Sequence, residues 1–479
     1  MRTPVNFITN VDSYKLGGHW NMSVSGLEYA YAYGEARVGS EYDETLFYSL
    51  QGILQEYMEG VVVTQGMIIE AKELTKYHLG DEQFMHLEGW QTIVDEFGGK
   101  LPVEIKAVPE GTLVPVGNVL FTIVNTDPRF PWLPNYMETQ LMRLWYGTTV
   151  ATRSYNIVKF LKGLIDTTSD IEGFEKFMLH DFGSRSTTTT EAAYVGGSAH
   201  LINSYGTDTV SGIQYIVANY EGDLENIAFS VPATEHSIAT AYGPNDGENY
   251  YVQILMDKYP HGILSLVADT YGIENFVTNV IGYLKDEIVN RNVISSSPVT
   301  KVVIRPDSPR FEDDTPEDQV LWIVEELEKI FGSSVNSKGY KVLHPSVGVL
   351  YGDGLSVQEI ENIYNLLVSK GWSAENCIVG QGGGLLQKLN RDTCRFAIKA
   401  SQITVNGKQK NIQKNPSDKT KASKTGRLKL VEMDGKIQTI NSEYPLYHDH
   451  KDLLQTVFLD GEMVKTYTLD EVRKNTGLW

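Results

Sequence analysis

The chain has 479 residues, 41% of them apolar and 21% charged, with a formal net charge of -20 at neutral pH. This composition is typical of a soluble globular protein with about two or three domains, and the negative charge disfavours binding to nucleic acid or anionic membranes. Only two cysteines occur, Cys377 and Cys394, which excludes a disulfide framework and matches no zinc-ligand spacing. No segment is apolar enough for a signal peptide or a membrane span, so we expect a cytoplasmic protein.

Residues 1–175 combine helical and extended patterns and predict the N-terminal α+β portion of a sheet domain. Amphipathic helical periodicity is found at 44–60, 66–78 and 136–147. The segment 101–126, "LPVEIKAVPEGTLVPVGNVLFTIVNT", instead alternates apolar and polar residues, which is typical of strands.

From residue 176 to 390 the pattern changes, because short apolar runs recur and each is followed by a polar turn and a helical pattern. The clear runs are "KFMLH" (176–180), "IAFSV" (227–231), "ILSLV" (263–267), "KVVI" (301–304), "VGVLY" (347–351) and "NCIVG" (376–380), and a weaker one precedes "GTDT" (206–209). This succession predicts an α/β domain built as a parallel barrel of irregular form.

The residues directly after these runs are polar or glycine-rich. They are "DFGSR" (Asp181–Arg185), "GTDT" with Asp208, "PATEHS" with His236, "ADT" with Asp269, "RPDS" with Arg305 and Asp307, "GDG" with Asp353, and "GQGGG" (Gly380–Gly384). In a parallel barrel the carboxyl ends of all strands lie at one mouth, so these segments converge although they are far apart in sequence. Loops favour Asp and Gly in any protein, but so many successive polar ends favour an active-site rim.

Residues 391–479 are expected to return as strands to the sheet domain, with hairpin turns centred on Asp434-Gly435 and Asp460-Gly461. The segment 406–429, "NGKQKNIQKNPSDKTKASKTGRLK", is basic although the chain as a whole is acidic. It is either a solvated loop or a flap that neutralises phosphates, and the residues alone leave both readings open.

The glycine-rich segment 380–392, "GQGGGLLQKLNRD", lies between a strand and a helical pattern. Glycines let backbone N–H groups approach a phosphate at the start of a helix, although the spacing is not that of a Walker loop or a dinucleotide fingerprint. The alternative is a tight turn that requires positive φ. Lys388 and Arg391 follow the glycines, and Arg185 and Arg305 add guanidinium groups suited to bidentate contacts.

Carboxylates and one aromatic residue complete the candidate site. Asp269, Asp307 and Asp353 suit ribose hydroxyls or Mg²⁺, although each alone is also a common helix N-cap. Asp208 is suited to accept from an N–H₂ group or to cap a helix, and Phe182 either offers a flat face to an aromatic ligand or belongs to the core. The residues by themselves therefore indicate a barrel enzyme that handles a phosphorylated sugar.

Taken together, the motifs resemble those of the nicotinamide phosphoribosyltransferases, within the type II phosphoribosyltransferase family. They are "VDSYK" (11–15), "LHDFGSR" (179–185), "GTDTVSG" (206–212), "SVPATEHS" (230–237), "VIRPDS" (303–308), "GDG" (352–354), "GQGGGLLQKLNRD" (380–392) and "GRLKL" (426–430). The similarity is collinear over almost the whole chain. The resemblance implies an irregular α/β barrel paired with a domain that has a mainly antiparallel sheet, in an obligate homodimer.

The resemblance also implies a reaction. Enzymes of this family join nicotinamide to phosphoribosyl pyrophosphate, giving nicotinamide mononucleotide and pyrophosphate in NAD salvage, with Mg²⁺ as cofactor and ATP as co-substrate. Phe182 and Tyr14 of the partner subunit are expected to sandwich the pyridine ring. Asp208 is expected to accept from the carboxamide N–H₂ and Arg305 to donate to its carbonyl. A carboxylate at Asp208 would repel nicotinate and so select the amide.

The resemblance assigns roles to further residues. Those expected to bind the phosphoribosyl and diphosphate groups are Arg37, Arg185, Asp307, Gly352, Asp353, Gly382, Gly383, Arg391, Lys399 and Lys424. A lone histidine is more often structural than catalytic, but His236 matches the family's histidine that ATP phosphorylates, with Asp269 and Asp307 as catalytic candidates. Glu235 and Asp12 are further acidic candidates, and the ligands of the metal stay unassigned.

The sequence departs from the family pattern at several positions. Ser184 stands where relatives often carry an aromatic residue, Gln381 interrupts the glycine run, and Pro309-Arg310 follows "RPDS" where a glycine is usual. These departures bear on affinity and ATP coupling more than on the reaction. Two rival functions are a nicotinate phosphoribosyltransferase, against which Asp208 argues, and a non-catalytic binding protein on the same scaffold, against which the complete rim argues.

Overall fold

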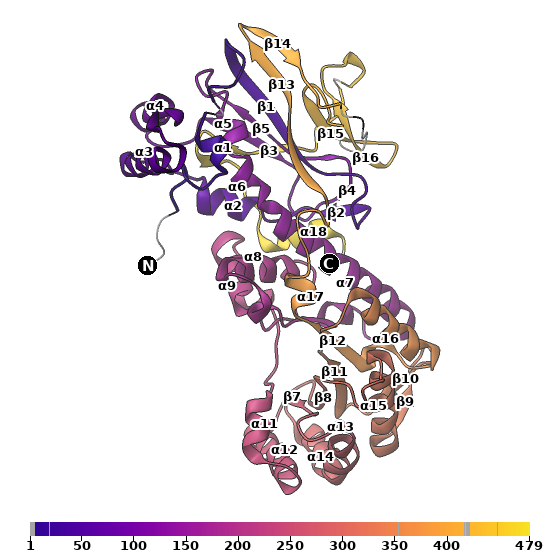
Figure 1. Cartoon of the computed structure of the whole chain (residues 1–479). Coiled ribbons are helices and arrows are strands. Elements are labelled where there is room, and N and C mark those ends of the chain that lie inside the picture. The colour runs from indigo at the N-terminus through magenta and orange to yellow at the C-terminus, as the bar shows by residue number, and fades with distance from the viewer. Residues whose placement is uncertain (1–4, 19, 353, 416, 418–421, 448) are drawn as a thin grey trace. The chain divides into compact units, whose positions relative to one another are not determined.

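The computed structural model describes the chain apart from residues 1–4, 19, 353, 416, 418–421 and 448, and it divides into two compact units (Figure 1). The first unit comprises Met1–Thr152, Tyr215–Gly222 and Leu389–Trp479, and the second comprises Arg153–Gln214 and Asp223–Lys388. The sequence predicts divisions after residues 175 and 390. The structure places the first division inside helix α7 (Leu144–Thr168) and returns a short segment, Tyr215–Gly222, to the first unit.

The first unit is built on a seven-stranded antiparallel sheet with the order β14-β13-β1-β5-β3-β17-β18. Its strands are β1 (Leu27–Ala36), β3 (Val103–Ala107), β5 (Val119–Asn125), β13 (Phe396–Val405), β14 (Lys408–Asn411), β17 (Gln455–Leu459) and β18 (Glu462–Met463). The alternation in β3 places every second side chain in the core, whereas β5, at the centre of the sheet, is buried at every residue. The expected antiparallel sheet, with strands from both ends of the chain, is therefore confirmed.

Two tight turns in this unit follow from Asp-Gly pairs. Strands β15 (Leu428–Met433) and β16 (Lys436–Asn441) are joined at Asp434-Gly435, where φ is 52° and 71°. Strands β17 and β18 are joined at Asp460-Gly461, where φ is 47° and 87°. Positive φ at both central residues is the requirement of a two-residue hairpin turn whose twist matches the strands.

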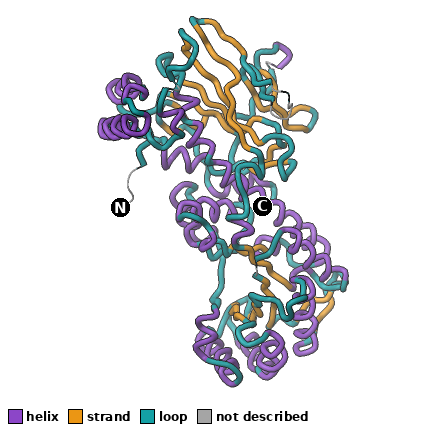
Figure 2. Tube along the Cα trace, in the orientation of Figure 1, coloured by secondary structure: helices purple, strands orange, loops and turns teal. Residues whose placement is uncertain are grey.

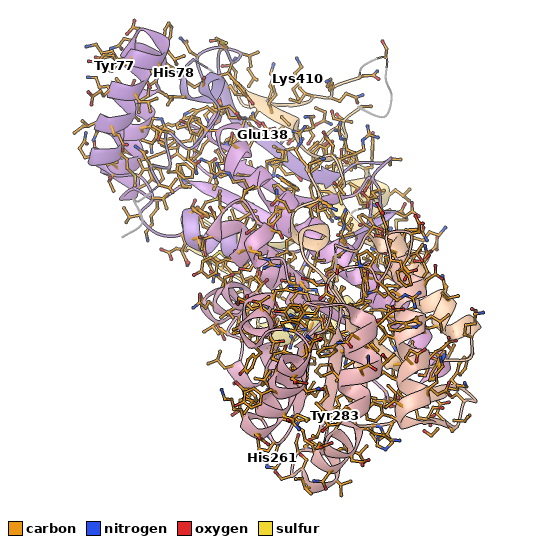
Figure 3. All side chains as sticks on the ribbon, turned by 60° about the horizontal axis from the view of Figure 1, so that its bottom comes forward. Tyr77, His78, Glu138, His261, Tyr283 and Lys410 are labelled. Carbon is orange, nitrogen blue, oxygen red and sulfur yellow. The ribbon has the colours of Figure 1, made fainter. Side chains whose placement is uncertain are left out.

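Helices cover the sheet of the first unit (Figures 1 and 2). They are α1 (Ser13–Leu16), α2 (Leu50–Tyr57), α3 (Gln65–Leu79), η1 (Glu82–Phe84), α4 (Leu87–Phe97), α5 (Leu133–Tyr136), α6 (Glu138–Met142), the start of α7, η7 (Pro445–Tyr447) and α18 (Leu469–Thr476). Helix α3 buries Ile68, Ala71 and Thr75 on one face, while Tyr77 and His78 project from the other (Figure 3). The helical pattern expected from residue 44 begins only at Leu50, because β2 (Glu44–Leu46) pairs with β4 (Leu113–Pro115).

The second unit is built around a parallel sheet with the order β6-β12-β11-β8-β7. Its strands are β6 (Leu179–Asp181), β7 (Ile263–Val267), β8 (Lys301–Arg305), β11 (Val347–Tyr351) and β12 (Cys377–Gln381). Single parallel bridges continue the sheet from Asp181 to Thr207, from Gly206 to Phe229 and from Ala233 to Ser265. These bridges close the ring, in which each strand or bridged segment forms one stave of the barrel. Two staves, at 206–207 and 229–233, consist only of bridged residues, so the barrel is irregular, as the sequence predicts.

Each stave of the barrel leads into helical structure (Figure 2). The helices of this unit are the rest of α7, η2 (Phe174–Phe177), η3 (Ser184–Ser186), α8 (Thr190–Leu201), the first half of α9 (Val210–Asn219), α10 (Leu224–Ile227), α11 (His236–Tyr242), α12 (Asp246–Lys258), α13 (Ile273–Asn275), η4 (Phe276–Ile281), α14 (Lys285–Ile294), α15 (Pro316–Phe331), α16 (Val357–Ser369), η5 (Ala374–Asn376) and α17 (Gly383–Leu386), beside a hairpin of β9 (Ser333–Val335) and β10 (Lys341–Leu343). Within the described part of the chain, no helix has the length and apolarity that a membrane span requires.

A buried carboxylate holds the start of α2 in the first unit. Glu110 accepts hydrogen bonds from the backbone N–H of Ser49 (3.2 Å) and Gln51 (2.7 Å) and from the hydroxyl of Tyr220 (2.7 Å). Burial raises the pKa of Glu110 to about 7, because desolvation outweighs the hydrogen bonds that lower it. Glu110 therefore takes the place of a side-chain cap, which Ser49 does not provide.

The raised pKa of Glu110 predicts a pH-dependent contribution to stability. The folded state binds this proton more tightly than the unfolded chain, so the stabilisation is full below about pH 4.5 and is lost as the pH rises through about 7. We expect the free energy of unfolding of the wild type, relative to Glu110→Gln, to fall by about 3 kcal/mol across this window. Urea denaturation of both proteins at several pH values measures the difference, and a difference that stays constant with pH would contradict the assignment.

Candidate active site

The carboxyl ends of the barrel staves bring most of the expected residues of the second unit to one mouth. Asp181 ends β6, Arg305 ends β8, and Gly352 follows β11. His236 begins α11 directly after the stave that ends at Ala233, and Asp269 lies two residues past β7. Asp353, the expected neighbour of Gly352, lies outside the described residues.

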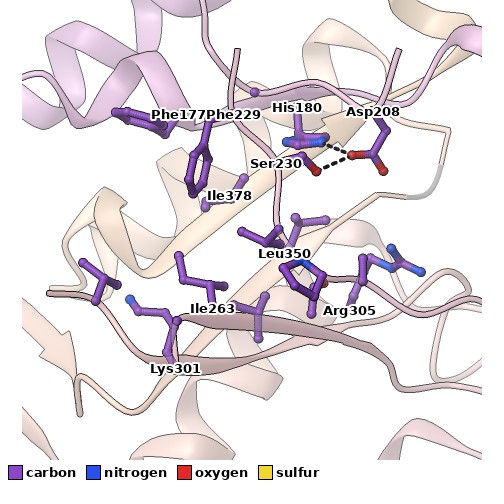
Figure 4. A pocket seen from close by; sticks show the side chains of 18 of the residues that line it. Phe177, His180, Asp208, Phe229, Ser230, Ile263, Lys301, Arg305, Leu350 and Ile378 are labelled. Carbon is purple, nitrogen blue, oxygen red and sulfur yellow. Dashed lines mark hydrogen bonds and ion pairs between the residues drawn. The ribbon is translucent and has the colours of Figure 1, made fainter. Parts of the chain in front are cut away.

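A cavity of about 580 Å³ extends along the barrel, lined by Asp208 and Arg305 at the carboxyl ends of the strands and by Ile263 and Lys301 at the amino ends (Figure 4). Its residues include the aromatic side chains Phe177, Phe182 and Phe229, the aliphatic side chains Ile263, Val303, Leu350 and Ile378, and the polar side chains His180, Asp208, Ser230, Lys301 and Arg305. The walls are thus mainly apolar with a few polar groups, which is typical of a small-molecule site.

The Asp208 carboxylate is held through one of its two oxygens. His180 Nε2 lies 2.9 Å from Oδ1, and the Ser230 hydroxyl donates to the same oxygen at 2.6 Å (Figure 4). Burial raises the pKa of Asp208, but the hydrogen bonds from His180 and Ser230 and the nearby charge of Arg305 outweigh it, so the net pKa is lowered. Oδ2 has no hydrogen-bond donor among the described residues, so it remains available to a ligand N–H group.

The Phe182 ring depends on the glycines of neighbouring strands. A methyl group at Gly380 would lie 2.2 Å from the ring, and one at Gly352 would lie 3.3 Å from it. The ring is also 4.7 Å from that of His180, and it lines the cavity. Gly380 is therefore required for the close approach of the ring, which lies beside His180 at the wall of the cavity.

Arg305 is anchored to the adjacent stave. Its Nη2 donates a hydrogen bond to the carbonyl oxygen of Thr234, and its side chain lines the cavity. Figure 4 shows the guanidinium group and the Asp208 carboxylate at the same end of the cavity. A donor and an acceptor therefore line the same cavity as the Phe182 ring, a set of groups suited to a planar amide.

His236 forms a cluster with two carboxylates. Its Nε2 lies 3.1 Å from Asp269 Oδ1, and its Nδ1 lies 3.9 Å from Asp307 Oδ2. The Ser308 hydroxyl donates to the other oxygen of Asp269. Because a carboxylate only accepts, this hydrogen bond requires a proton on Nε2, and the tautomer of neutral imidazole that provides it has its lone pair on Nδ1. Glu235 bonds to the Ser237 hydroxyl and not to the imidazole.

The side chain of Gln381 does not enter the glycine-rich loop. The side chain of Gln381 is buried, and its Nε2 donates to the Leu355 carbonyl at 2.7 Å, so it points into the protein rather than into the loop. Gly382 and Gly383 follow at the start of α17, beside Phe182 and Ser186. The carbonyl oxygens of Gly384 and Lys388 accept from Arg153 Nη1 at 2.7 and 2.9 Å.

Other sequence departures also have local partners. Arg310 donates to Asp314 at 2.9 Å, and its guanidinium lies 4.7 Å from the Trp322 ring, so the loop after "RPDS" is held by its own side chains and by helix α15. Ser184 belongs to η3, as does the exposed Arg185.

The remaining expected residues belong to the first unit. Tyr14 is 63% exposed, and its hydroxyl lies 3.4 Å from Asp12, which also accepts from Thr139. Three cations of this unit are near enough to Lys399 to influence its amine: Arg37, Arg391 and Lys414. Burial, together with these three cations, lowers the pKa of the Lys399 amine.

Lys424 pairs with the buried Glu35. At least one lysine of the basic segment 406–429 is therefore held by an ion pair within the first unit.

Sequence reasoning did not assign roles to His180, Ser230, Thr234 and Arg153. His180 and Ser230 lie inside quoted motifs, "LHDFGSR" and "SVPATEHS", but their spacing carries no sign that they share one carboxylate oxygen. Arg153 lies inside a helical pattern, and a long-range bond from a helix to a loop has no local signal.

Comparison with solved structures defines the class of the fold. The human nicotinic acid phosphoribosyltransferase matches with a TM-score of 0.60 at 13% identity, covering 100% of this chain and 93% of the other. A nicotinate-nucleotide pyrophosphorylase from Pyrococcus furiosus matches with a TM-score of 0.55 at 16% identity, covering 99% and 97%. The fold is thus shared with these two proteins, which confirms the expected fold class of an irregular α/β barrel with an antiparallel sheet domain.

Sequence comparison then gives the family. Residues 177–462 match the model of the nicotinate phosphoribosyltransferase (NAPRTase) family, and residues 6–105 match that of the N-terminal domain of nicotinamide phosphoribosyltransferase. The nicotinamide phosphoribosyltransferases of Xanthomonas campestris and Acinetobacter baylyi are 39% and 31% identical, and each alignment covers 98% of this chain and 97% of the relative. The chain belongs to the NAPRTase family and is a phosphoribosyltransferase.

The contact between Gly380 and Phe182 can be tested by adding one methyl group. Gly380→Ala should displace the Phe182 ring and destabilise the protein by about 1–3 kcal/mol, because the added carbon has no space. Gly163→Ala is the matched control, since this exposed helical glycine has nothing within 4 Å of the added carbon. Thermal denaturation should show a lower melting temperature only for Gly380→Ala, and equal melting temperatures would contradict the packing described.

Proposed function

We propose that the chain joins nicotinamide to phosphoribosyl pyrophosphate, giving nicotinamide mononucleotide and pyrophosphate in NAD salvage. The observation that carries this proposal is the Asp208 carboxylate at the cavity wall, with one oxygen held by His180 and Ser230 and the other without a donor among the described residues. The names of the Xanthomonas and Acinetobacter relatives support the same substrate.

Both the N–H₂ and the carbonyl oxygen of the amide would be recognised. Asp208 Oδ2 accepts from the N–H₂, Arg305 donates to the carbonyl, and the pyridine ring stacks on Phe182. Nicotinate would place a second carboxylate against Asp208, whose lowered pKa keeps it ionised. The site therefore favours the amide through repulsion of the acid as well as attraction of its own substrate.

The phosphoribosyl group would lie across the strand ends beside the ring. In this proposal, its contacts in the second unit are Arg185, Asp307, Gly352, Asp353, Gly382 and Gly383. Arg37, Arg391, Lys399 and Lys424 of the first unit would bind the diphosphate. Tyr14 of the partner subunit would cover the other face of the pyridine ring in a homodimer, with Asp12 beside it, and the exposure of Tyr14 supports that role.

The transfer needs no covalent sugar intermediate. The pyridine nitrogen forms a bond to C1 of the ribose as the bond from C1 to the pyrophosphate oxygen breaks, and that bonding pair leaves with pyrophosphate. Positive charge develops on the ribose in between. The chain's contribution is to position the nitrogen over C1 and to place cations near the leaving group.

Mg²⁺ fits the donor set at this mouth. Among the described residues no three His, Cys, Asp or Glu side chains could hold an ion by themselves. Mg²⁺ usually keeps several waters and binds substrate phosphates with one or two carboxylates, and Asp307, which is 41% exposed, is available for this. When bound, the ion would neutralise charge on the leaving pyrophosphate.

His236 would couple ATP to the transfer. With Nε2 donating to Asp269, the lone pair of Nδ1 attacks the γ-phosphorus of ATP; a nitrogen–phosphorus bond forms, the bond to the β,γ-bridging oxygen breaks, and ADP leaves. Water later hydrolyses the phosphohistidine to phosphate. Asp269 holds the ring and stabilises its positive charge during the attack, as the buried partner of a catalytic histidine does.

The reaction is tested by incubating the protein with nicotinamide, phosphoribosyl pyrophosphate and Mg²⁺. We expect nicotinamide mononucleotide by mass spectrometry, and substitution of nicotinate for nicotinamide should give little product. Efficient turnover of nicotinate would identify a nicotinate phosphoribosyltransferase instead. Absence of product with either substrate would support a non-catalytic protein.

Asp208→Ser tests the residue that carries the substrate assignment. Loss of a hydrogen bond to a charged group should lower kcat/KM for nicotinamide by about 10- to 100-fold. Removal of the charge should also lower the preference for nicotinamide over nicotinate by at least about tenfold. The control is Asp286→Ser, which removes an exposed carboxylate from α14. An unchanged preference in Asp208→Ser would refute its role.

His236→Gln tests the coupling to ATP. Without an imidazole no phosphohistidine forms, so the variant should lose ATP hydrolysis and the acid-labile phosphate seen after incubation of the wild type with labelled ATP. Synthesis of nicotinamide mononucleotide in the absence of ATP should persist within about tenfold, because the transfer itself does not pass through His236. If ATP hydrolysis is retained, another residue is the nucleophile.

A further inference from the structure

Thr234 is a buried polar residue fixed by four hydrogen bonds at the carboxyl end of a barrel stave. Its exposure is 7%. Its N–H donates to Ser265 O at 3.0 Å, and its Oγ1 accepts from Val267 N at 2.9 Å and lies 2.5 Å from the hydroxyl of Tyr251. Its carbonyl oxygen accepts from Arg305. Every polar atom of Thr234 is therefore paired, so its position is closely determined.

Tyr251 supports both ends of the segment that carries His236. It is 1% exposed on α12, its hydroxyl meets Thr234 before the start of α11, and its ring centroid lies 5.5 Å from that of Tyr242, the last residue of α11. Burial raises the pKa of the Tyr251 phenol to about 12, so the hydroxyl stays neutral and keeps its proton for the hydrogen bond.

The Thr234–Tyr251 hydrogen bond stands between two functional groups of the mouth. On one side, the Thr234 carbonyl orients Arg305, whose guanidinium faces the cavity. On the other side, Thr234 is two residues before His236, and the backbone N–H that it receives belongs to Val267, two residues before Asp269. A shift of Thr234 would therefore move Arg305 and the His236–Asp269 pair together.

The two buried hydroxyl groups of Thr234 and Tyr251 are not needed to fill space in the core. Phenylalanine and valine would fill nearly the same volume without polar atoms that need partners, and a buried hydroxyl is tolerated only when it is hydrogen-bonded. The pair therefore contributes a fixed geometry, since two polar atoms that must meet allow fewer arrangements than two apolar surfaces.

We propose that Thr234 and Tyr251 are positioning residues that hold Arg305 and His236 in one arrangement, so that recognition of the amide and use of ATP at His236 depend on the same hydrogen bond. This inference rests on the function proposed above. Neither side chain touches a substrate, and both act through Arg305 and the backbone before His236.

The experiment measures steady-state kinetics of the full-length chain with and without ATP. Tyr251→Phe removes one oxygen and keeps the ring. It should raise KM for nicotinamide about fivefold, the scale of one hydrogen bond, with kcat in the absence of ATP within about twofold. It should also lower the nicotinamide mononucleotide formed per ATP hydrolysed by about twofold or more, because the histidine and the amide site no longer share one geometry.

Matched variants separate positioning from stability. Tyr250→Phe is the control, because this neighbour on α12 is 57% exposed and its hydroxyl makes no hydrogen bond within the described structure. Thr234→Val should reproduce the effect of Tyr251→Phe, and Thr234→Ser, which keeps the hydroxyl, should restore wild-type values. The double variant Thr234→Val/Tyr251→Phe should raise KM by less than the product of the two single effects, because both remove the same bond.

The outcomes distinguish this inference from the function on which it rests. A raised KM and a lowered product per ATP in Tyr251→Phe, absent in Tyr250→Phe and not multiplied in the double variant, support it. Unchanged KM and product per ATP in an active Tyr251→Phe protein overturn it while the proposed function stands. The inference is also overturned if kcat falls only to the extent that folded protein is lost, as shown by a lower melting temperature. A wild-type protein that makes no nicotinamide mononucleotide overturns both.

Discussion

The hydrogen bonds from His180 and Ser230 to one oxygen of Asp208 are the interaction on which the account of this site depends. They satisfy Oδ1, help to keep the carboxylate ionised at the wall of a mainly apolar cavity and leave Oδ2 without a donor among the described residues. If Asp208 were neutral or turned into the wall, the cavity would hold a planar ring but would not distinguish an amide from an acid. The substrate assignment therefore rests on the environment of one carboxylate more than on the shape of the pocket.

The barrel makes this arrangement possible because it gathers short segments from distant parts of the sequence. The stave at 206–207 carries Asp208, the stave at 229–233 carries Ser230, and β6 carries His180, so three neighbouring staves meet at one carboxylate. The stave at 229–233 also pairs with β7 through Ala233 and Ser265, and β7 leads to Asp269. Directly after this stave, the Thr234 carbonyl holds Arg305 at the end of β8. The bridges that make the barrel irregular are thus the connections that place the site residues.

The sequence predicts the elements of this domain well and their side-chain partners poorly. Each apolar run lies on or beside a stave, because burial on both faces of a parallel strand leaves a continuous apolar signal. The rim residues follow from the rule that strand ends share a mouth. Partners such as His180 for Asp208, or Tyr251 for Thr234, depend on distances between separate elements and have no local pattern. Gln381 is another example. Its position among glycines suggests that its side chain changes the loop, but the side chain bonds to the Leu355 carbonyl inside the protein. The return of Tyr215–Gly222 to the first unit likewise has no compositional sign.

The most direct test of the central claim is a crystal structure of the wild-type protein with nicotinamide bound. The account predicts the pyridine ring against Phe182, with one heteroatom of the carboxamide within about 3 Å of Asp208 Oδ2 and the other directed at Arg305, while His180 and Ser230 keep their bonds to Oδ1. A ring bound elsewhere in the cavity, or a carboxamide with no contact to Asp208, would contradict it.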